Sequence, residues 1–421
     1  MKRADFFGKM MTASQTKFGK DHCYTAAEHV KTHYGIELPN LALRFLFTSN
    51  IFPLERMTEL SGPRGSGKST FGYELMRLFL DALGLGTVVE TENKTNAHLI
   101  KGVVGEENWE MVQYFQADSL EKAMDELSFS LQYYKKNCPE KSIPYIALWD
   151  SLMGAKSDDT IEKVDEAGHS VKQYATEANL ISTFFGTLPE ALLGYPICFV
   201  YTNHEKVKMQ EGFAGAGGPK HSNPGGLAPG FYNTYHVRVT CVKQVDRKAM
   251  NPYMVLQLET EKNNMGLAKR RIQVKLSFNR ITNEAGDTKL DVKFDWDQAT
   301  VDLLMSKDLP ARSLVNELFV VTAGGAAGRY NCTALGLKDA DAATVCSTLY
   351  ANVPLYRRLQ GILSIDEWRV FAAPSPVEEK PKKSRKRKAP EPGDAAEPEE
   401  ADSAAEPEPA EDPEESKNAD A

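Results

Sequence analysis

The sequence predicts an α/β protein whose core is a mostly parallel sheet. Short apolar, β-rich runs alternate with stretches of helical periodicity, which is the pattern of β–α–β units. A glycine-rich segment lies between one such strand and an amphipathic helix, as phosphate-binding loops do. Further along, three predicted strands follow one another without a helix, which predicts an antiparallel extension of the sheet.

Apolar runs locate the elements. The predicted strands, in chain order, are Arg56–Leu60, Thr87–Glu92, Tyr145–Leu152, Ile197–Asn203, Tyr235–Val245, Tyr253–Glu261 and Arg271–Asn279. Helical spacing of apolar residues predicts helices over Ser69–Leu83 and Leu120–Tyr134. Because helices separate the first strands, those strands should be parallel and buried.

The chain divides into four predicted parts. Residues 1–35 form a short helical arm, 36–294 the α/β core, and 295–373 a smaller α+β domain. Residues 374–421 form a tail that contains nine of the 22 prolines and no aromatic residue. Because such a composition cannot supply a core, we expect the tail to be disordered.

The net charge of −8 belongs almost entirely to this tail. Glu391–Ala421 carries 13 Asp and Glu against one Lys, whereas Pro374–Pro390 carries seven Lys and Arg against two Glu. The first 373 residues are therefore nearly neutral, so the acidic average does not argue against a nucleic-acid partner. The basic run Lys382–Lys388 is typical of a nuclear-import or nucleic-acid patch, or of plain solvated charge.

Several classes of protein are excluded. No apolar run reaches the roughly 18 residues of a transmembrane helix, and the N-terminus lacks the apolar stretch of a secretory signal. The six cysteines show no metal-binding or CxxC spacing and are expected to be free thiols of a reducing compartment. We therefore expect a cytoplasmic protein without a membrane partner, although the basic run leaves a nucleus-like compartment open.

The strongest motif fits the phosphate-binding pattern G-x-x-x-x-G-K-[ST]. It reads Gly62-Pro63-Arg64-Gly65-Ser66-Gly67-Lys68-Ser69-Thr70. Glycines let backbone N–H groups close around phosphates, the lysine reaches the terminal phosphate oxygens, and Ser69 can bind Mg²⁺. ATP and Mg²⁺ are thus the predicted ligands, the alternative being a glycine-rich turn that binds nothing.

Two further strands end in carboxylates. Asp150 ends an apolar run and is expected to hold the Mg²⁺ shell, the alternative being a helix N-cap. Glu90 and Glu92 end the strand that follows the phosphate loop, and either can point inward. We prefer Glu92 as the catalytic group that activates water, because ligands bind beyond the carboxyl ends of parallel strands. Its alternative is an exposed strand-end charge.

A long glycine-rich loop follows the strand that ends at His204. Seven glycines and three prolines lie among the 19 residues from Gly212 to Gly230. Loops of this length are usually functional or disordered. The region also carries basic and aromatic side chains that suit a bound polymer, namely Lys206, Lys208, Phe213, Lys220 and His221. The alternative is a flexible surface loop.

In order and spacing these motifs resemble those of the RecA-type recombinases, and they are most similar to the UvsX recombinases of tailed phages. The resemblance extends from about Gly35 to Asn279 and, more weakly, to Phe371. It rests on GPRGSGKST, ETEN, ALWDS, Tyr201-Thr202-Asn203-His204, Gly225-Gly226 with Gly230-Phe231-Tyr232, and Glu261-Lys262-Asn263.

The resemblance implies roles for matching positions. Lys68 and Ser69 match the loop lysine and the Mg²⁺ ligand, Glu92 the water-activating glutamate, and Asp150 the Mg²⁺-shell carboxylate. His204 occupies the position that senses the γ-phosphate. Lys262 matches a basic residue that reaches the ATP of the neighbouring subunit, whereas Asn264 replaces a second lysine there.

The resemblance also implies DNA-binding segments. Lys206–Gly226 matches the second DNA loop, with Lys206, Lys208, Phe213, Lys220, His221, Asn223, Gly225 and Gly226 as the candidate contacts. Residues 156–172 correspond to the first DNA loop, but that segment is rich in acids.

The implied function is an ATP-dependent recombinase, hence a DNA-dependent ATPase. It would form a homo-oligomeric helical filament on single-stranded DNA and exchange strands with double-stranded DNA, aided by a mediator and a single-strand-binding protein. The arm would pack on the adjacent protomer, the alternative being a helix on its own domain. The acidic tail would compete with DNA.

Two other classes remain as alternatives. A hexameric helicase with a RecA fold can carry the same motifs, although no helicase-like domain precedes the core in this sequence. A DNA-regulated ATPase or a non-catalytic nucleotide-gated scaffold is the other alternative. The joint presence of Lys68, Glu92 and Asp150 favours catalysis over a scaffold.

Overall fold

The computed structural model describes most of the chain up to residue 372. The described residues are 3–19, 23, 34–94, 97–138, 141–158, 161, 174–208, 220–222, 228–245, 252–282 and 288–372. They belong to one compact unit, Met1–Pro374. The tail that we expect to be disordered lies outside the described residues. Of the described helices, none is long and apolar enough to cross a membrane.

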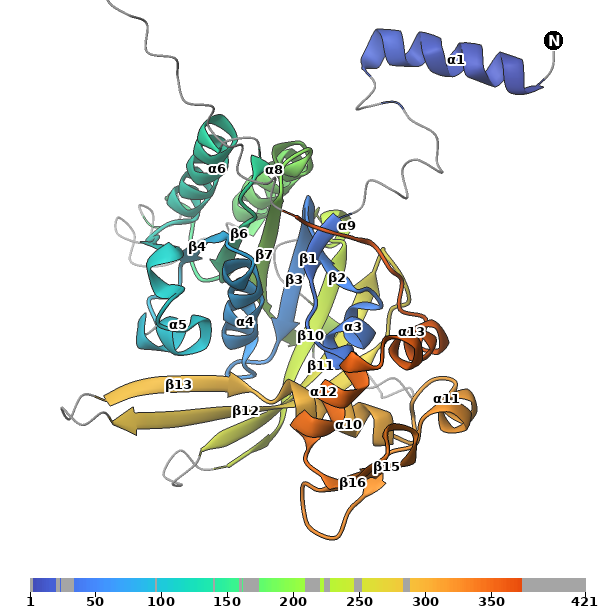
Figure 1. Ribbon diagram of the computed structural model, residues 1–421. Coiled ribbons are helices and arrows are strands. Elements are labelled where there is room, and N and C mark those ends of the chain that lie inside the picture. Colours follow the sequence, from blue (N-terminus) through green and yellow to red (C-terminus); the bar gives the residue numbers. More distant parts are fainter. Residues whose placement is uncertain are drawn as a thin grey trace, which may run out of the picture. The chain divides into compact units, whose positions relative to one another are not determined.

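A mixed sheet dominates the fold (Figure 1). Its nine strands lie in the order β13 (Thr288–Phe294), β12 (Arg271–Thr282), β11 (Tyr253–Asn263), β10 (Tyr235–Gln244), β3 (Arg56–Gly62), β7 (Ile197–His204), β6 (Tyr145–Asp150), β4 (Leu85–Glu90) and β5 (Val112–Gln116). The six strands from β10 to β5 are parallel, and β11, β12 and β13 extend them in antiparallel fashion. The predicted α/β class and antiparallel extension are confirmed.

All seven predicted strands are present, but the two edge strands, β5 and β13, were not predicted. An edge strand buries fewer side chains than a central one, so its alternation is weaker. Most residues of β5 are exposed or half-buried, and β13 carries three charges in seven residues. Their place in the sheet depends on neighbours that are distant in sequence.

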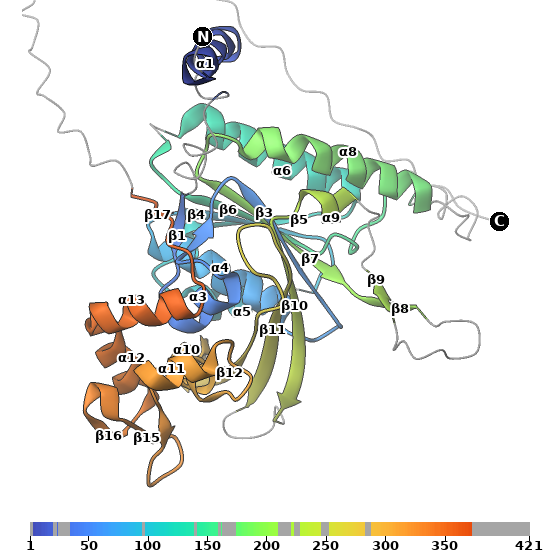
Figure 2. The same ribbon diagram turned by 90° about the vertical axis from the view of Figure 1, so that its right-hand side faces the viewer.

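Helices cover the two faces of the sheet (Figure 2). On one face lie α4 (Lys68–Asp81) and α5 (Ala97–Val104), and on the other α6 (Leu120–Asn137) and α8 (Tyr174–Leu192). Two buried hydrophobic clusters result, one on each side. Because both faces of the central strands are covered, β6 is buried at every position and β7 at all but its last.

Local signals set the ends of the two predicted helices. α4 begins directly after Gly67, which adopts φ +90°, and it ends two residues earlier than predicted because Leu83 turns the chain at φ +60°. α6 begins after Ser119, whose hydroxyl accepts the N–H of Lys122. These bounds place the N-terminus of α4 at the phosphate loop.

The C-terminal region is α+β, as predicted. It contains α10 (Trp296–Met305), α11 (Arg312–Leu318), α12 (Ala342–Ala351), α13 (Val353–Ile362) and a three-stranded sheet of β14 (Thr322–Ala323), β15 (Tyr330–Cys332) and β16 (Leu337–Ala340), with a short helix η3 (Thr333–Leu335).

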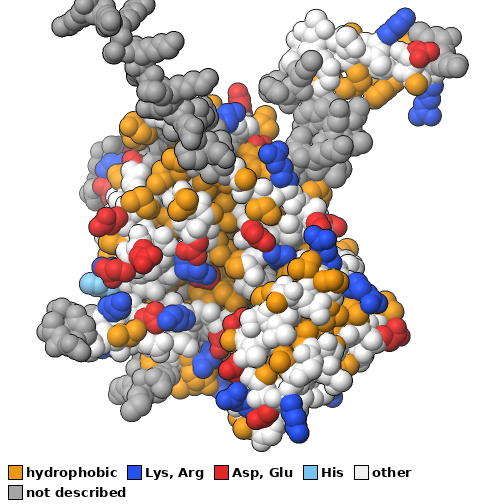
Figure 3. Space-filling view, viewed as in Figure 1, with side chains coloured by type: hydrophobic (Ala, Val, Ile, Leu, Met, Phe, Trp, Pro, Cys, Tyr) orange, Lys and Arg blue, Asp and Glu red, His pale blue; other side chains and the backbone are white. Residues whose placement is uncertain are grey.

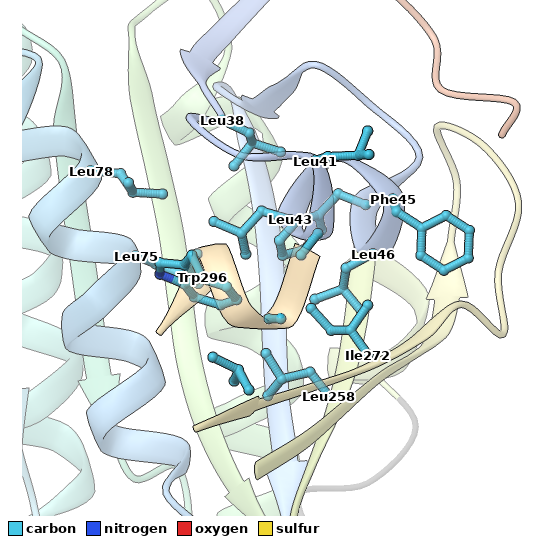
Figure 4. Close-up of a cluster of buried hydrophobic side chains, with 14 of the residues drawn as sticks. Leu38, Leu41, Leu43, Phe45, Leu46, Leu75, Leu78, Leu258, Ile272 and Trp296 are labelled. Atoms are coloured by element: carbon cyan, nitrogen blue, oxygen red, sulfur yellow. The ribbon is translucent and has the colours of Figure 1, made fainter. Parts of the chain in front are cut away.

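This region shares the core of the sheet. Figure 4 shows Trp296 of α10 beside Leu75 of α4 and Leu43 of α3 (Leu41–Phe47). Trp296 also donates its indole N–H to Glu74 (2.7 Å). The predicted boundary at 294/295 therefore falls within one continuous core.

The two ends of the compact unit meet at a small sheet. β1 (Tyr34–Glu37) pairs with β2 (Ile51–Pro53) and with β17 (Arg369–Val370), and Tyr34 stacks on Phe371. The predicted arm is helical as α1 (Arg3–Phe18), none of whose residues is buried. The first and last strands among the described residues are therefore direct neighbours.

Candidate functional site

The predicted site residues meet at one edge of the sheet. β3, β4, β6 and β7 are parallel, so their carboxyl ends lie side by side. The phosphate loop follows β3, Glu92 follows β4, Asp150 ends β6 and His204 ends β7. Side chains that are far apart in sequence therefore converge where open α/β sheets bind ligands.

The loop lysine is buried and engaged with the loop itself. Lys68 Nζ donates to the carbonyl oxygens of Gly62 (3.0 Å) and Pro63 (2.8 Å). Burial lowers the pKa of this ammonium, and the nearby charges of Asp150 and Glu92 partly offset that effect. Among the described residues, the buried hydroxyl of Ser66 has no hydrogen-bond partner. A cation and an orphaned donor in a glycine cradle fit a phosphate group.

The glycines of the loop are required by geometry. Gly62 has φ +151°, and a Cβ at this position would lie 2.1 Å from the carbonyl oxygen of Val239. Gly67 has φ +90°, and its added Cβ would press on Leu256. Any other residue at Gly62 would push the loop off the end of β3.

Asp150 is held rigidly by two hydroxyl donors. Thr202 donates to Oδ1 (2.5 Å) and Tyr73 to Oδ2 (3.3 Å). The peptide bond that follows Asp150 is cis. Among the described residues, no three His, Cys, Asp or Glu side chains gather as a metal site. The residues do fit Mg²⁺, which usually takes only one or two protein ligands beside phosphate oxygens and water; Ser69 and Asp150 would be those ligands.

Glu90 and Glu92 have different surroundings. Glu90 is buried and accepts the backbone N–H groups of Glu92, Asn93 and Lys94 (2.8–3.1 Å), so it shapes the turn after β4. Glu92 contacts His204, Ser151 and Lys94 instead. The geometry therefore favours Glu92 as the group that faces the ligand.

His204 and Glu92 form a close pair. Because a carboxylate only accepts hydrogen bonds, the imidazole Nε2 donates to Glu92 Oε1. His204 Nδ1 is buried and has no hydrogen-bond partner among the described residues. Hydrogen bonds from His204, Lys94 (2.6 Å) and Ser151 (2.6 Å) hold the pKa of Glu92 well below its usual value, against the effect of burial.

A partly buried ion pair beside the loop was not predicted. Glu205, directly after His204, accepts two hydrogen bonds from Arg238 of β10 (2.6 and 2.9 Å), and its own N–H donates to Gly62 (3.2 Å). The pair spans the end of β3. Its contact with the phosphate loop depends on strand order, which single-residue patterns do not reveal.

Three other contacts were also missed. Ser151 and Lys94 bind Glu92, and Thr202 binds Asp150. The sequence contained one signal for these contacts, since each of the three residues lies within two positions of a predicted site residue.

The predicted DNA loops are described only in part. β8 (Lys206–Lys208) pairs with β9 (Lys220–Ser222) as an antiparallel hairpin that begins two residues after His204. The backbone of Lys206, Lys208, Lys220 and His221 therefore belongs to this hairpin. Phe213, Asn223, Gly225 and Gly226 lie outside the described residues, as does most of the segment 156–172.

Lys262 does not join the phosphate loop of its own subunit. Its Nζ donates to the carbonyl oxygens of Gly230 (2.8 Å) and Phe231 (3.3 Å) in α9 (Ala228–Tyr232), which follows the second predicted loop. Burial lowers the pKa of this lysine. It thus ties the end of β11 to the segment after that loop.

Comparison with known proteins adds no assignment: no protein-family model and no curated protein matches the chain.

Proposed function

We propose that the chain is an ATP-dependent DNA recombinase of the RecA type that assembles on single-stranded DNA. The observation that carries this proposal is the convergence of Lys68, Asp150, Glu92 and His204 at one edge of the sheet. These are the groups that hydrolysis of a nucleoside triphosphate needs: a phosphate cradle, a Mg²⁺ shell, a base and a sensor.

In this proposal Glu92 orients and deprotonates water, and His204 controls Glu92. A carboxylate that accepts three hydrogen bonds is a weak base. The γ-phosphate of ATP would compete for the His204 N–H, and Glu92 would then lose one of its three hydrogen bonds. ATP supplies the transferable phosphoryl group and Mg²⁺ balances its charge. Lys68 would exchange its carbonyl partners for phosphate oxygens.

The same contact would report the nucleotide state to DNA. Only Glu205 separates His204 from the β8–β9 hairpin, and Glu205 is bound by Arg238 of β10, the strand on the other side of β3. A shift of His204 would therefore move the root of the predicted DNA loop. Its basic residues suit phosphate contacts, which give affinity for DNA with little sequence preference.

Self-assembly is supported by two complementary apolar surfaces. α1 exposes Phe6, Phe7, Met10 and Phe18. A groove of about 560 Å³ lies between the edge strand β5 and α6, and it is lined by Met111, Phe129 and Tyr133. Figure 3 shows hydrophobic side chains gathered over the region of α6. We expect the arm of a second copy to occupy this groove.

The first test is ATP hydrolysis with and without single-stranded DNA, with Glu92→Gln as the matched control. We expect strong stimulation by DNA, and a loss of about 10²–10⁴-fold in the variant. Stimulation would then justify a strand-exchange assay. Hydrolysis indifferent to DNA would contradict the recombinase proposal, and unwinding of a forked duplex would favour the helicase class instead.

A further inference from the structure

A second polar cavity lies away from the phosphate loop. It has a volume of about 590 Å³ and is lined by strands β11 and β12, the second half of α10 and the segment after α10. Its charged and amide lining consists of Lys269 and Arg270 just before β12, Arg271 at its start, the amides of Gln257 and Gln273, and the carboxylates of Asp302 and Asp308. Cavities of this size hold small organic ligands.

Arg270 is the buried cation of this cavity and favours an anionic ligand. The residue is only 7% exposed, and no carboxylate of the described residues forms an ion pair with it. Its guanidinium lies 4.7 Å from the ring centroid of Phe45 and makes one long hydrogen bond to the carbonyl of Leu363 (3.4 Å). Figure 4 shows Phe45 at the side of α3 that faces the connection between β11 and β12.

These contacts do not neutralise the charge. Nε of Arg270 is buried and has no hydrogen-bond partner among the described residues. Burial lowers the pKa of the guanidinium, yet an arginine stays charged in proteins. A buried charge without a counter-charge is costly unless an anion or water meets it. The neighbouring Arg271 differs, because Glu259 binds it (2.9 Å) and more than half of its side chain is exposed.

The other residues that line the cavity indicate which kind of anion it would bind. Asp302, on the part of α10 that lines the cavity, is exposed and accepts a hydrogen bond from Gln298 (2.7 Å). Gln257 and Gln273 face each other across β11 and β12. A ligand that combines an anionic group with hydroxyl or amino donors would therefore match both the cations and the carboxylates of the lining. A nucleoside phosphate combines these groups.

We propose that this cavity binds a nucleotide phosphate, with Arg270 and Lys269 on the phosphate and Asp302 on the sugar or base. The site is separate from the phosphate loop and does not depend on the proposed ATPase function. The phosphate can belong to a free nucleotide or to the 5′ end of a DNA strand, since both present the same group.

The test uses the full-length chain with Lys68→Ala, so that the phosphate loop cannot contribute. Titration calorimetry and ³¹P line broadening would follow inorganic phosphate, AMP, and a short oligonucleotide with and without a 5′-phosphate. We expect Arg270→Gln to weaken inorganic phosphate and AMP by about tenfold or more. Asp302→Asn should weaken AMP alone. Binding of the oligonucleotide only when it is phosphorylated would identify a strand end as the source.

Arg280→Gln is the matched control, because it removes the same charge from an exposed position of β12 outside the cavity lining, and it should change affinity less than about twofold. Since Arg270 also contacts Leu363, circular dichroism must show that Arg270→Gln folds; Lys269→Ala provides an exposed second variant that should weaken phosphate as well. Absence of phosphate and AMP binding at millimolar concentration would overturn the proposal. Equal losses in Arg280→Gln and Arg270→Gln would also overturn it, as would binding of acetate as tight as that of phosphate.

Discussion

Glu90 and Glu92 lie two residues apart, and their surroundings give the two carboxylates different tasks. Glu90 accepts three backbone N–H groups and is nearly inaccessible. Glu92 is only partly buried and accepts from three side chains. A group that must exchange partners during a reaction needs the second kind of environment, because backbone donors in a turn cannot leave.

The three donors on Glu92 predict a pH dependence of stability. The folded-state pKa is lowered from 4.5, so the contribution of Glu92 is present above pH 4.5 and is lost as the pH falls toward the folded-state pKa. The free energy of unfolding of the wild type, relative to Glu92→Gln, should therefore decrease below about pH 4.5. Urea denaturation at several pH values measures this difference. A difference that stays constant down to pH 3 would contradict the assignment.

At the scale of elements, the order of the strands in the sheet brings together side chains that are far apart in the sequence. β3 lies between β7 and β10, so Glu205 and Arg238 meet across the start of the phosphate loop. The pair lies against the loop through Gly62, which also accepts from Lys68.

Breaking one side of this pair should cost more than removing both sides. Arg238→Ala removes the two charged hydrogen bonds that Glu205 accepts from the guanidinium, and we expect a loss of about 2 kcal/mol in the free energy of unfolding. The double variant Glu205→Gln, Arg238→Ala should recover part of that loss. Arg271→Ala, which removes an exposed pair with Glu259, should cost less than about 1 kcal/mol. Equal losses in the single and double variants would rule out this explanation.

Two glycines of the phosphate loop should respond differently to alanine. At Gly62 an added Cβ meets the Val239 carbonyl oxygen at 2.1 Å, whereas at Gly65 it meets nothing within 4 Å. Gly62→Ala should therefore abolish nucleotide binding and lower the melting temperature strongly. Gly65→Ala should cost only about 1–2 kcal/mol, the strain of a positive φ. Thermal unfolding with and without nucleotide compares them; similar losses would mean that the approach to Val239 is unimportant.

At the scale of the whole molecule, the first and last strands among the described residues are neighbours. β1 (Tyr34–Glu37) and β17 (Arg369–Val370) pair directly. Residues from opposite ends of the described sequence therefore lie side by side.

Self-assembly should depend on both the arm and the groove. Deleting residues 2–19 and the substitution Phe129→Asp should each prevent formation of large oligomers in sedimentation velocity experiments with nucleotide and DNA. Val353→Asp, which alters an exposed apolar residue of α13, is the matched control and should assemble normally. Normal assembly of Phe129→Asp would show that the arm binds elsewhere.

The acidic tail should weaken DNA binding by electrostatic competition. Deletion of Glu391–Ala421 removes 13 acids and one lysine, so affinity for single-stranded DNA should increase, most clearly at moderate salt. A salt titration of binding by fluorescence anisotropy measures this effect. Identical titration curves for the full and truncated chains would contradict the idea.

The sequence by itself determined the local features. The phosphate loop, the central strands and the α/β class follow from residue types at fixed spacing, because glycine conformations and strand periodicity are local properties. It also pointed to Asp150, Glu92 and His204, each at or just after the end of a strand.

Only the tertiary structure decided which of these groups touch and which lie apart. It paired Glu92 with His204 and Glu205 with Arg238, and it buried Arg270, whose Nε has no hydrogen-bond partner in the part of the chain that the structure describes. It also merged residues 295–372 into the core of the sheet and added the edge strands β5 and β13. These contacts join residues more than about thirty positions apart, and such distances are set by strand order and packing, which leave no periodic trace along the chain.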